Sequence, residues 1–265
     1  MTRLVEVDIA DLTEKLAKYD LYLKEVCGKN LEGIAKTAAK KSESPAAARV
    51  AVVPVTSGLG IINGFSETVA GIANFLGYSA RVTNETDIAG IAEAVSGQCD
   101  ILMAADDETF IAVNPKKRLV SDNSEATGRG YATALSLAAG GLESRDVLLL
   151  GAGPVGRAAA AVMLLGGARL TVYDTDAGKA ESLRRSHPSV RIARNLDEAL
   201  SEHSLLFDAT PSGAFIRKEP LRQDAILSAP GVPLCLDSEC EEWMRGRVLH
   251  DVLEIGVATM LFDVT

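Results

Sequence analysis

The stretch DVLLLGAGPVG, residues 146–156, decides the fold class because it joins an apolar strand directly to a glycine-rich turn. The turn matches the pattern GxGxxG at every position, and the apolar run RAAAAVMLL (157–165) after it predicts a helix. A second apolar stretch, LTVYD (170–174), completes a strand–helix–strand unit of the length that dinucleotide-binding folds use. The sequence therefore predicts an α/β chain whose C-terminal part, residues 144–265, is a Rossmann dinucleotide-binding domain.

The glycines and the acid of this unit have separate tasks in such a fold. Gly151 permits the tight turn, Gly153 lets the backbone approach a pyrophosphate, and Gly156 lets helix and strand pack closely. Asp174 ends the second strand, where it would accept hydrogen bonds from the ribose hydroxyls. The residues after Asp174, Thr175 and Asp176, include no Arg that would bind the 2'-phosphate of NADP, and the second carboxylate would repel it. We therefore expect NAD rather than NADP. The alternative is a glycine turn without a ligand.

Two later loops are further candidates for cofactor contacts. The segment DATPSG (208–213) closes an apolar strand, and APGVP (229–233) follows one unit later. Loops at the carboxyl ends of parallel strands line the nucleotide crevice, although a plain turn explains either segment equally well. The predicted cofactor-binding residues are Gly151, Gly153, Pro154, Val155, Gly156, Asp174, Thr210, Pro211, Ser212 and Pro230.

The first half of the chain also alternates strands with helices. Apolar residues recur at three- and four-residue steps from Val7 to about Ala39, which predicts helix, and the polar segment 40–48 with Pro45 predicts a connection. The sequence predicts strands at 50–55, 79–83 and 100–105, and helices at about 66–77 and 87–96. This alternation is typical of a mostly parallel sheet.

The boundary between two domains is predicted near residue 143. Residues 107–125 are predicted to form a loop around Asn114-Pro115, and residues 132–139 a connecting helix that ends at Gly140-Gly141. The first domain, 1–143, then combines the N-terminal helices with a small α/β substrate-binding part. We expect the C-terminal helix to cross back to this first domain.

Composition excludes several classes of function. The 265 residues carry a net charge of -9, which argues against a nucleic-acid groove and against binding to an anionic membrane surface. No apolar run approaches the length of a membrane span, and the acidic N-terminus is unlike a signal peptide, so we expect a cytoplasmic protein. The four cysteines are scattered without a CxxC pair, which predicts buried thiols and no metal site.

The usual acid–base residues are not evident from the sequence. His187 precedes Pro188 in a polar turn and His203 ends a polar helix, so both are predicted to be solvated, while the role of His250 stays open. The chain has no GxSxG, HExxH or P-loop pattern, which weakens hydrolase, metalloprotease and NTPase functions.

Several motifs, in chain order, resemble one family. They are PVTSGLGIINGFS (54–66), ILMAADDETF (101–110), ATGRGYA (126–132), VLLLGAGPVG (147–156), DATPS (208–212), APGVP (229–233) and IGVATML (255–261). From about residue 50 to the end, the chain resembles the pyrrolysine-biosynthesis dehydrogenase family PylD. The resemblance implies an NAD-dependent enzyme that oxidises the terminal amine of 3-methylornithyl-N6-lysine, whose product closes to the pyrroline ring of pyrrolysine.

The same resemblance implies a set of site residues. The substrate-binding residues would be Ser57, Asn63, Asp106, Asn123 and Asp251, with Asp106 and Asp251 as the catalytic acids. Carboxylates suit the ammonium groups of such a substrate, and Ser or Asn suits its carboxylate and amide.

Alternatives remain for several of these positions. Asn63 or Ser66 would equally suit the cap of the following helix, and Asp106 or its neighbour Asp107 a solvated strand end. The family has Gly before Asn where this chain has Asn63-Gly64. Its tail reads Glu-Pro-Leu-Gly where this chain has residues 251–254, so either Asp251 or Glu254 fills the acidic role.

Two other functions compete with this one. Another NAD-dependent amino-acid dehydrogenase or cyclodeaminase would share the C-terminal motifs without the PVTSG loop. A non-catalytic NAD-binding sensor would bind NAD without reducing it. A homodimer is compatible with each of these hypotheses.

Overall fold

The computed structural model describes residues 6–9, 12–43 and 48–265, which form two compact units. Unit 1 comprises the described residues up to Tyr22 together with Asn30–Thr127 and Val252–Thr265, and unit 2 comprises Leu23–Lys29 and Gly128–Asp251. In the middle of the chain, the two units divide between Thr127 and Gly128, inside one continuous helix. Independent folding of domains 1–143 and 144–265 stays a prediction.

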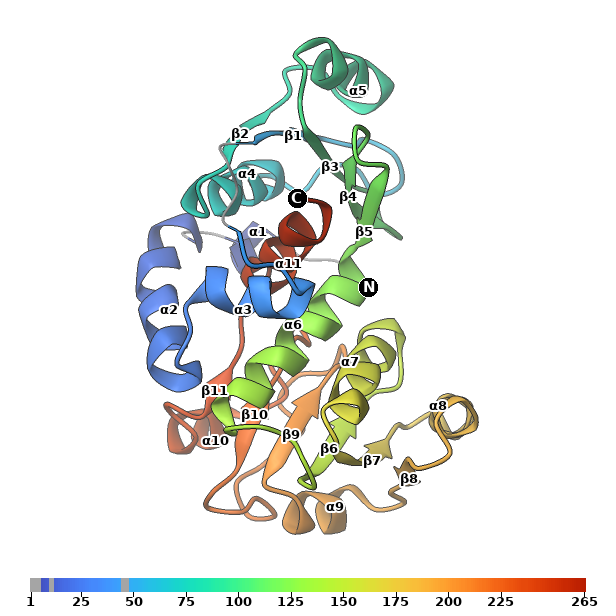
Figure 1. Ribbon diagram of the computed structural model, residues 1–265. Coiled ribbons are helices and arrows are strands. Elements are labelled where there is room, and N and C mark those ends of the chain that lie inside the picture. Colours follow the sequence, from blue (N-terminus) through green and yellow to red (C-terminus); the bar gives the residue numbers. More distant parts are fainter. Residues whose placement is uncertain (1–5, 10–11, 44–47) are drawn as a thin grey trace. The chain divides into compact units, whose positions relative to one another are not determined.

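Unit 1 consists of a mixed sheet with helices on both faces (Figure 1). Its elements are α1 (Glu6–Ile9), α2 (Leu12–Cys27), α3 (Leu31–Ala39), β1 (Arg49–Val53), α4 (Phe65–Phe75), β2 (Ser79–Val82), α5 (Asp87–Ser96), β3 (Ile101–Ala105), β4 (Phe110–Asn114), β5 (Leu119–Asp122), α6 (Asn123–Ala138) and α11 (Glu254–Val264). Helices α2 and α6 have residues in both units.

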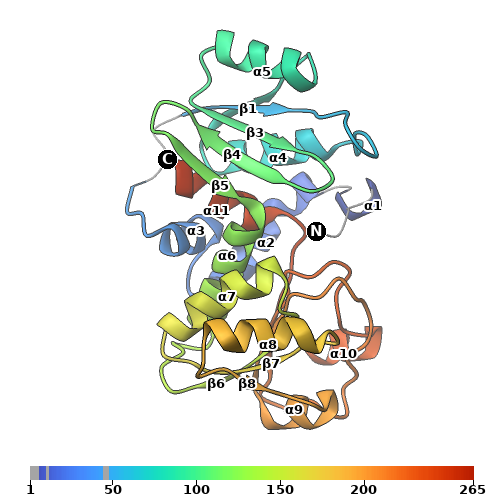
Figure 2. The same cartoon turned by 90° about the vertical axis from the view of Figure 1, so that its right-hand side faces the viewer.

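Strand β1 is the centre of the parallel part of this sheet. The strand order is β2-β1-β3-β4-β5, and β1 pairs in parallel with both β2 and β3. Figure 2 shows α5 on one face of the sheet and α4 with α11 on the other. Ala51 and Val53 pack with Ala94 of α5, and the intervening Val50 and Val52 are buried as well. Because both faces of β1 are covered, its sequence is apolar without alternation.

The predicted loop at 107–125 is wrong, because most of this segment is an antiparallel hairpin. Strands β3, β4 and β5 pair in antiparallel order, and Pro115 lies in the turn that follows Asn114. The sequence FIAVN alternates buried and half-buried residues, which is the period of a strand with one covered face. The sheet of unit 1 is therefore mixed rather than mostly parallel.

The N-terminal helical segment is interrupted at a glycine. Helix α2 ends at Cys27, Gly28 has a left-handed φ of 68°, and Asn30 caps α3 by accepting a hydrogen bond from Gly33 N. Residues 10–11 of the predicted helix and residues 44–47 of the predicted connection, with Pro45, lie outside the described residues.

Helix α11 forms part of the core of unit 1. Almost all of its residues are buried, and it packs against α3, α4, β4 and β5. The side-chain amide of Asn114 donates to Val264 O at 2.8 Å, and Ser121 Oγ donates to Asp263 at 2.6 Å. The end of the chain thus belongs with the first unit.

Unit 2 is a parallel sheet with the strand order β11-β10-β9-β6-β7-β8. Helices alternate with most of these strands, and unit 2 also contains the parts of α2 and α6 assigned to it above. The bounds are β6 (Asp146–Leu150), α7 (Pro154–Leu165), β7 (Arg169–Tyr173), α8 (Ala177–Ser186), β8 (Arg191–Ile192), α9 (Leu196–Glu202), β9 (Leu205–Asp208), β10 (Ile226–Ser228), α10 (Ser238–Trp243) and β11 (Val248–Leu249). The predicted α/β class and Rossmann arrangement are confirmed.

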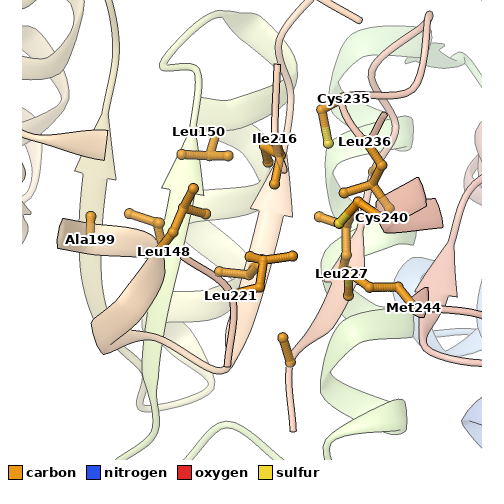
Figure 3. Close-up of a cluster of buried hydrophobic side chains, with 14 residues drawn as sticks. Leu148, Leu150, Ala199, Ile216, Leu221, Leu227, Cys235, Leu236, Cys240 and Met244 are labelled. Carbon is orange, nitrogen blue, oxygen red and sulfur yellow. The ribbon is translucent and has the colours of Figure 1, made fainter. Parts of the chain in front are cut away.

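The core of unit 2 explains the apolar strand from which the sequence analysis began. Figure 2 shows α9 on the opposite face of the sheet from α7 and α8. Leu148 and Leu150 of β6 belong to a buried cluster with Ala199 of α9 and Met244 at the end of α10 (Figure 3). Val147 and Leu149 are equally buried, and their side chains point to the other face.

No helix in the described part of the chain is both long and apolar enough to span a bilayer.

We predict that Asn114→Ala lowers the free energy of unfolding by about 1–3 kcal/mol, the usual cost of leaving buried backbone groups without partners. The variant removes both the donor to Val264 O and the acceptor of Lys117 N. Urea unfolding followed by circular dichroism measures the loss. Lys117→Ala is the control, because only the backbone of Lys117 takes part in these bonds; equal stability of all three proteins would contradict the role of Asn114.

Candidate functional site

The glycine-rich turn of unit 2 is tied to the end of the neighbouring strand β7. Gly151 N donates to Tyr173 O at 2.9 Å, and Ala152 N donates to Asp174 Oδ2 at 2.7 Å. The other carboxylate oxygen of Asp174 accepts from Asp176 N at 2.8 Å. The acid that the sequence analysis paired with the turn therefore lies against it, half-buried, with its position set by two backbone amides.

The turn leaves space where a ligand backbone would approach. A Cβ atom on Gly156 would collide with Gly151 O, so this glycine is needed for the fold. A Cβ atom on Gly153 would meet nothing within 4 Å. Gly153 is the N-cap of α7, followed by Pro154 at the first position, and amides in a first helical turn lack carbonyl partners within the helix. Open space beside such amides and a positive helix end fits a pyrophosphate.

The two later loops meet this turn at one edge of the sheet. Ala209 N donates to Leu150 O at 2.8 Å, and Gly231 N donates to Asp208 O at 3.2 Å. Strand β6 lies between β7 and β9, so the chain changes direction across the sheet at this point. Ligands of open α/β sheets bind at such a switch point. The structure thus brings Thr210 against Gly151, and the loops that carry Pro211, Ser212 and Pro230 follow strands of the same parallel sheet. A role of these residues in cofactor binding stays a prediction.

The strand before the first of these loops ends in a buried acid, Asp208, that the sequence analysis did not single out. Asp208 ends β9 and is fully buried; its Oδ1 accepts from Thr210 N at 3.1 Å and from Thr210 Oγ1 at 2.8 Å. No described residue reaches Oδ2 with hydrogen-bond geometry, although the Cys235 thiol is a neighbour. Burial raises the pKa of Asp208 to about 6, while Thr210, Cys235 and the charge of His250 lower it. The signal in the sequence was one charged residue inside the apolar strand LLFDAT.

Two histidines have structural partners. The prediction of a solvated His203 is wrong: it is buried, and its ring nitrogens bond Ala199 O at 2.7 Å and Thr171 Oγ1 at 3.1 Å. His250 is half-buried, with Nδ1 at 2.7 Å from Ala229 O. The four cysteines are free and buried, as predicted. The described residues contain no group of His, Cys, Asp and Glu that would hold a metal ion.

In unit 1, Ser57 and Asn63 lie on the loop between β1 and α4, which we call loop 54–64. Both side chains are exposed. Gly64, with a φ of 81°, occupies the N-cap of α4 without a side-chain bond, so the alternative that Asn63 or Ser66 caps this helix is wrong. Within the loop, Gly60 N donates to Ser57 O at a distance of 3.4 Å.

Asp106 and Asp107 follow strand β3 and have different partners. Asp106 Oδ1 accepts from Glu108 N at 2.9 Å and from Thr109 N at 2.7 Å, and these bonds hold the pKa of this carboxyl below its usual range. Asp106 is therefore ionised and shapes the β3–β4 turn. Asp107 Oδ2 accepts from Leu59 N at 2.6 Å, so the expectation that Asp107 is merely solvated is wrong.

Asn123 begins α6 and lies against the first turn of α11. Its Oδ1 accepts from Thr127 Oγ1 at 3.2 Å. A Cβ atom on Gly256 would lie 2.5 Å from Thr127 Oγ1 and 3.1 Å from Asn123 Oδ1. The glycine of the IGVATML motif therefore permits the close approach of the two helices, which sequence alone did not explain.

The two acids near the C-terminus occupy different settings. Asp251 is buried, and its backbone N–H and C=O both bond the hydroxyl of the buried Tyr131, at 2.8 and 2.9 Å. Glu254 begins α11, and its Oε2 accepts from Leu253 N at 3.0 Å and Val252 N at 3.2 Å. Glu254 thus binds the amides that precede the helix, and Tyr131 of the ATGRGYA motif positions the backbone of Asp251.

A parallel sheet with a glycine-rich turn at its switch point and an acid on the next strand defines the class of dinucleotide-binding proteins with a Rossmann fold. Solved structures of that class share the fold. Quinate dehydrogenase from Corynebacterium glutamicum in complex with NAD has a TM-score of 0.55 and 14% identity, over 82% of this chain and 93% of that chain. Shikimate dehydrogenase from Aquifex aeolicus has the same TM-score and identity, over 83% and 94%.

The full-length relatives are more specific. Pyrrolysine synthase from Methanosarcina acetivorans is 32% identical over 264 residues, covering 100% of both chains. Its counterpart from Methanosarcina barkeri is 33% identical, covering 100% of this chain and 98% of its own. The family described as the N-terminal domain of pyrrolysine biosynthesis protein PylD matches residues 8–121. The chain belongs to the PylD family, which confirms the resemblance.

We predict opposite effects from two alanine substitutions in the turn. Gly153→Ala should leave the stability of the cofactor-free protein unchanged but weaken NAD binding by about tenfold or more, because the new methyl group occupies the approach of the pyrophosphate. Gly156→Ala should lower the free energy of unfolding by about 1–3 kcal/mol through overpacking. Urea unfolding and calorimetric NAD titration separate the two effects. Wild-type NAD affinity in Gly153→Ala would exclude the turn as the pyrophosphate site.

We predict that Asp208 makes stability fall as the pH rises. Its pKa is about 6 in the folded protein and near 4 when unfolded, so the folded state holds the proton more tightly. The stabilisation is complete below the unfolded value and is lost as the pH rises through the folded value. Between pH 5 and pH 8 the wild type should lose about 1 kcal/mol more than Asp208→Asn in urea unfolding. Parallel curves for the two proteins would show that Asp208 is not titrating in this range.

Proposed function

We propose that this chain catalyses the NAD-dependent oxidation of the terminal amine of 3-methylornithyl-N6-lysine, and that the product then closes to pyrrolysine. The observation that carries the proposal is similarity to two pyrrolysine synthases over the whole chain. It is supported by a turn that fits a pyrophosphate in unit 2 and by polar side chains on loop 54–64 and the strand ends of unit 1.

The proposed reaction is a hydride transfer. The carbon that bears the terminal amine gives a hydride to the nicotinamide, so the C–N single bond becomes an imine, NAD is reduced to NADH and one proton is released. Attack by a second amine of the same molecule then forms the ring and expels ammonia. Positioning the carbon against the nicotinamide is the main contribution that a protein makes to such cofactor chemistry.

We assign the substrate to the residues that the family motifs indicated. Ser57, Asn63 and Asn123 would bind the carboxylate and amide groups, and Asp106 and Asp251 the ammonium groups. Asp106 is ionised and exposed, which suits an ammonium partner. Between the two C-terminal acids we choose Asp251, whose backbone is positioned by the Tyr131 hydroxyl of the ATGRGYA motif.

We assign NAD rather than NADP as the cofactor. Asp174 and Asp176 both lie at the end of β7, and two carboxylates would repel a 2'-phosphate. The nearby Arg157 is engaged elsewhere: its Nε donates to Ala152 O at 3.0 Å, and its Nη1 to Ser182 Oγ at 3.3 Å.

The proposal is tested by mixing the purified protein with NAD and synthetic 3-methylornithyl-N6-lysine, following NADH absorbance and recording the product mass. We expect NADH together with the mass of pyrrolysine, and a much higher kcat/KM with NAD than with NADP. NADH formed only with other amino acids would favour a different amino-acid dehydrogenase or a cyclodeaminase. NAD binding without NADH on any amine would favour a sensor.

The same assay has a predicted pH dependence. Only a neutral amine has the lone pair that assists hydride loss, and an amine with a pKa near 10 requires about 4 kcal/mol to be neutral at pH 7. The rate under saturating NAD should therefore rise between pH 6 and pH 10. A flat profile with chemistry rate-limiting would argue against amine oxidation.

A further inference from the structure

Loop 54–64 is hydrogen-bonded to two aspartates from later segments of the chain, and the proposed function does not use either of them. The first is Asp87, at the start of α5. Its Oδ1 accepts from Thr56 N at 2.8 Å, and its Oδ2 accepts from Thr56 Oγ1 at 2.6 Å. Asp87 N in turn donates to Pro54 O at 2.9 Å. One residue thus bonds the loop at three atoms, just before Ser57.

The second aspartate is Asp107, which follows β3. Its Oδ2 accepts from Leu59 N at 2.6 Å, two residues after Ser57. A Cβ atom on Gly58 would collide with this carboxylate, and the φ of Gly58 is 72°. The glycine at position 58 of the PVTSG motif is therefore what allows the Asp107 carboxylate to reach the loop.

The sheet order explains why two acids from distant parts of the chain meet at one loop. Strand β1 lies between β2 and β3 and is parallel to both, so the segments after all three strands emerge at the same edge. Loop 54–64 leaves β1, Asp87 comes after β2, and Asp107 comes after β3. The two carboxylates consequently hold the loop from its two sides.

Burial of apolar side chains contributes little to the order of this loop near Ser57. The side chains of Leu59 and Ile61 are 76% and 46% exposed, so they contribute little burial. Asp87 also has a left-handed φ of 54°, a conformation that is uncommon for residues other than glycine and is best tolerated by Asp and Asn. This conformation brings both carboxylate oxygens to Thr56.

We propose that Asp87 and Asp107 are positioning residues, an aspartate clamp that fixes loop 54–64 so that Ser57 is held in place for the substrate. The substrate part rests on the proposed function; the ordering of the loop does not. A preorganised loop binds its ligand without the entropic cost of ordering it, so the clamp acts on substrate affinity more than on the chemical step.

The clamp is tested with Asp87→Ala and Asp107→Ala, singly and together. Each should raise the KM for 3-methylornithyl-N6-lysine by about tenfold and change kcat by less than about threefold, with NAD affinity unchanged. Asp87→Ala should also lower the Tm by about 2–4 °C, because Ala tolerates the left-handed backbone poorly. Asp87→Asn should restore most of the wild-type KM, because Asn tolerates the left-handed backbone. Its side-chain oxygen can accept from Thr56 N, and its NH2 group can donate to Thr56 Oγ1. Glu108→Gln is the matched control, an exposed acid of the same turn whose side chain is not in the clamp.

Hydrogen exchange of the peptide that covers residues 54–65 provides a readout that needs no substrate. The alanine variants should exchange faster there than the wild type and Glu108→Gln. Unchanged exchange in both single variants would overturn the clamp whatever the activity. Faster exchange with an unchanged KM would overturn the positioning role. A wild type inactive on this substrate, with faster exchange in the variants, would refute the proposed function and retain the clamp.

Discussion

Parallel strand pairing is the constraint on which the candidate sites of both units depend. Parallel strands that share a sheet end at the same edge, so loops far apart in sequence are brought together there. In unit 2 this places the loops after β6, β9 and β10 side by side, and in unit 1 the segments after β1, β2 and β3. Each set is joined by hydrogen bonds between residues that are neighbours only through the sheet.

Acidic side chains connect several of these loops and turns by accepting hydrogen bonds from backbone amides. Asp174 holds the glycine turn, Asp106 the β3–β4 turn, and Asp87 and Asp107 loop 54–64. Asp208 differs because it is fully buried, so desolvation raises its pKa although it accepts two hydrogen bonds. Some of the acidic residues that give the chain its negative charge thus stabilise turns and loops, which composition alone did not indicate.

Much of the architecture could be predicted because it is encoded locally. The strand 146–150 and the glycine turn were predictable, since a strand buried on both faces is continuously apolar and GxGxxG between a strand and a helix is typical of a dinucleotide-binding turn. The hairpin of β4 and β5 was missed because Asn114-Pro115 dominates a short segment whose alternation is weak. The buried setting of His203 was missed because its helix looks polar, while its ring is covered through Thr171 of β7.

The sequence by itself determined the class of fold, the glycine turn and the family, because these depend on residues within about 30 positions of each other or on ordered motifs. Only the tertiary structure decided which acidic side chains accept hydrogen bonds from backbone amides of distant loops. Asp87 and Thr56 are 31 residues apart, and Asp107 and Leu59 are 48 apart. No local pattern records such pairs, because sheet order rather than sequence spacing brings them within hydrogen-bond distance.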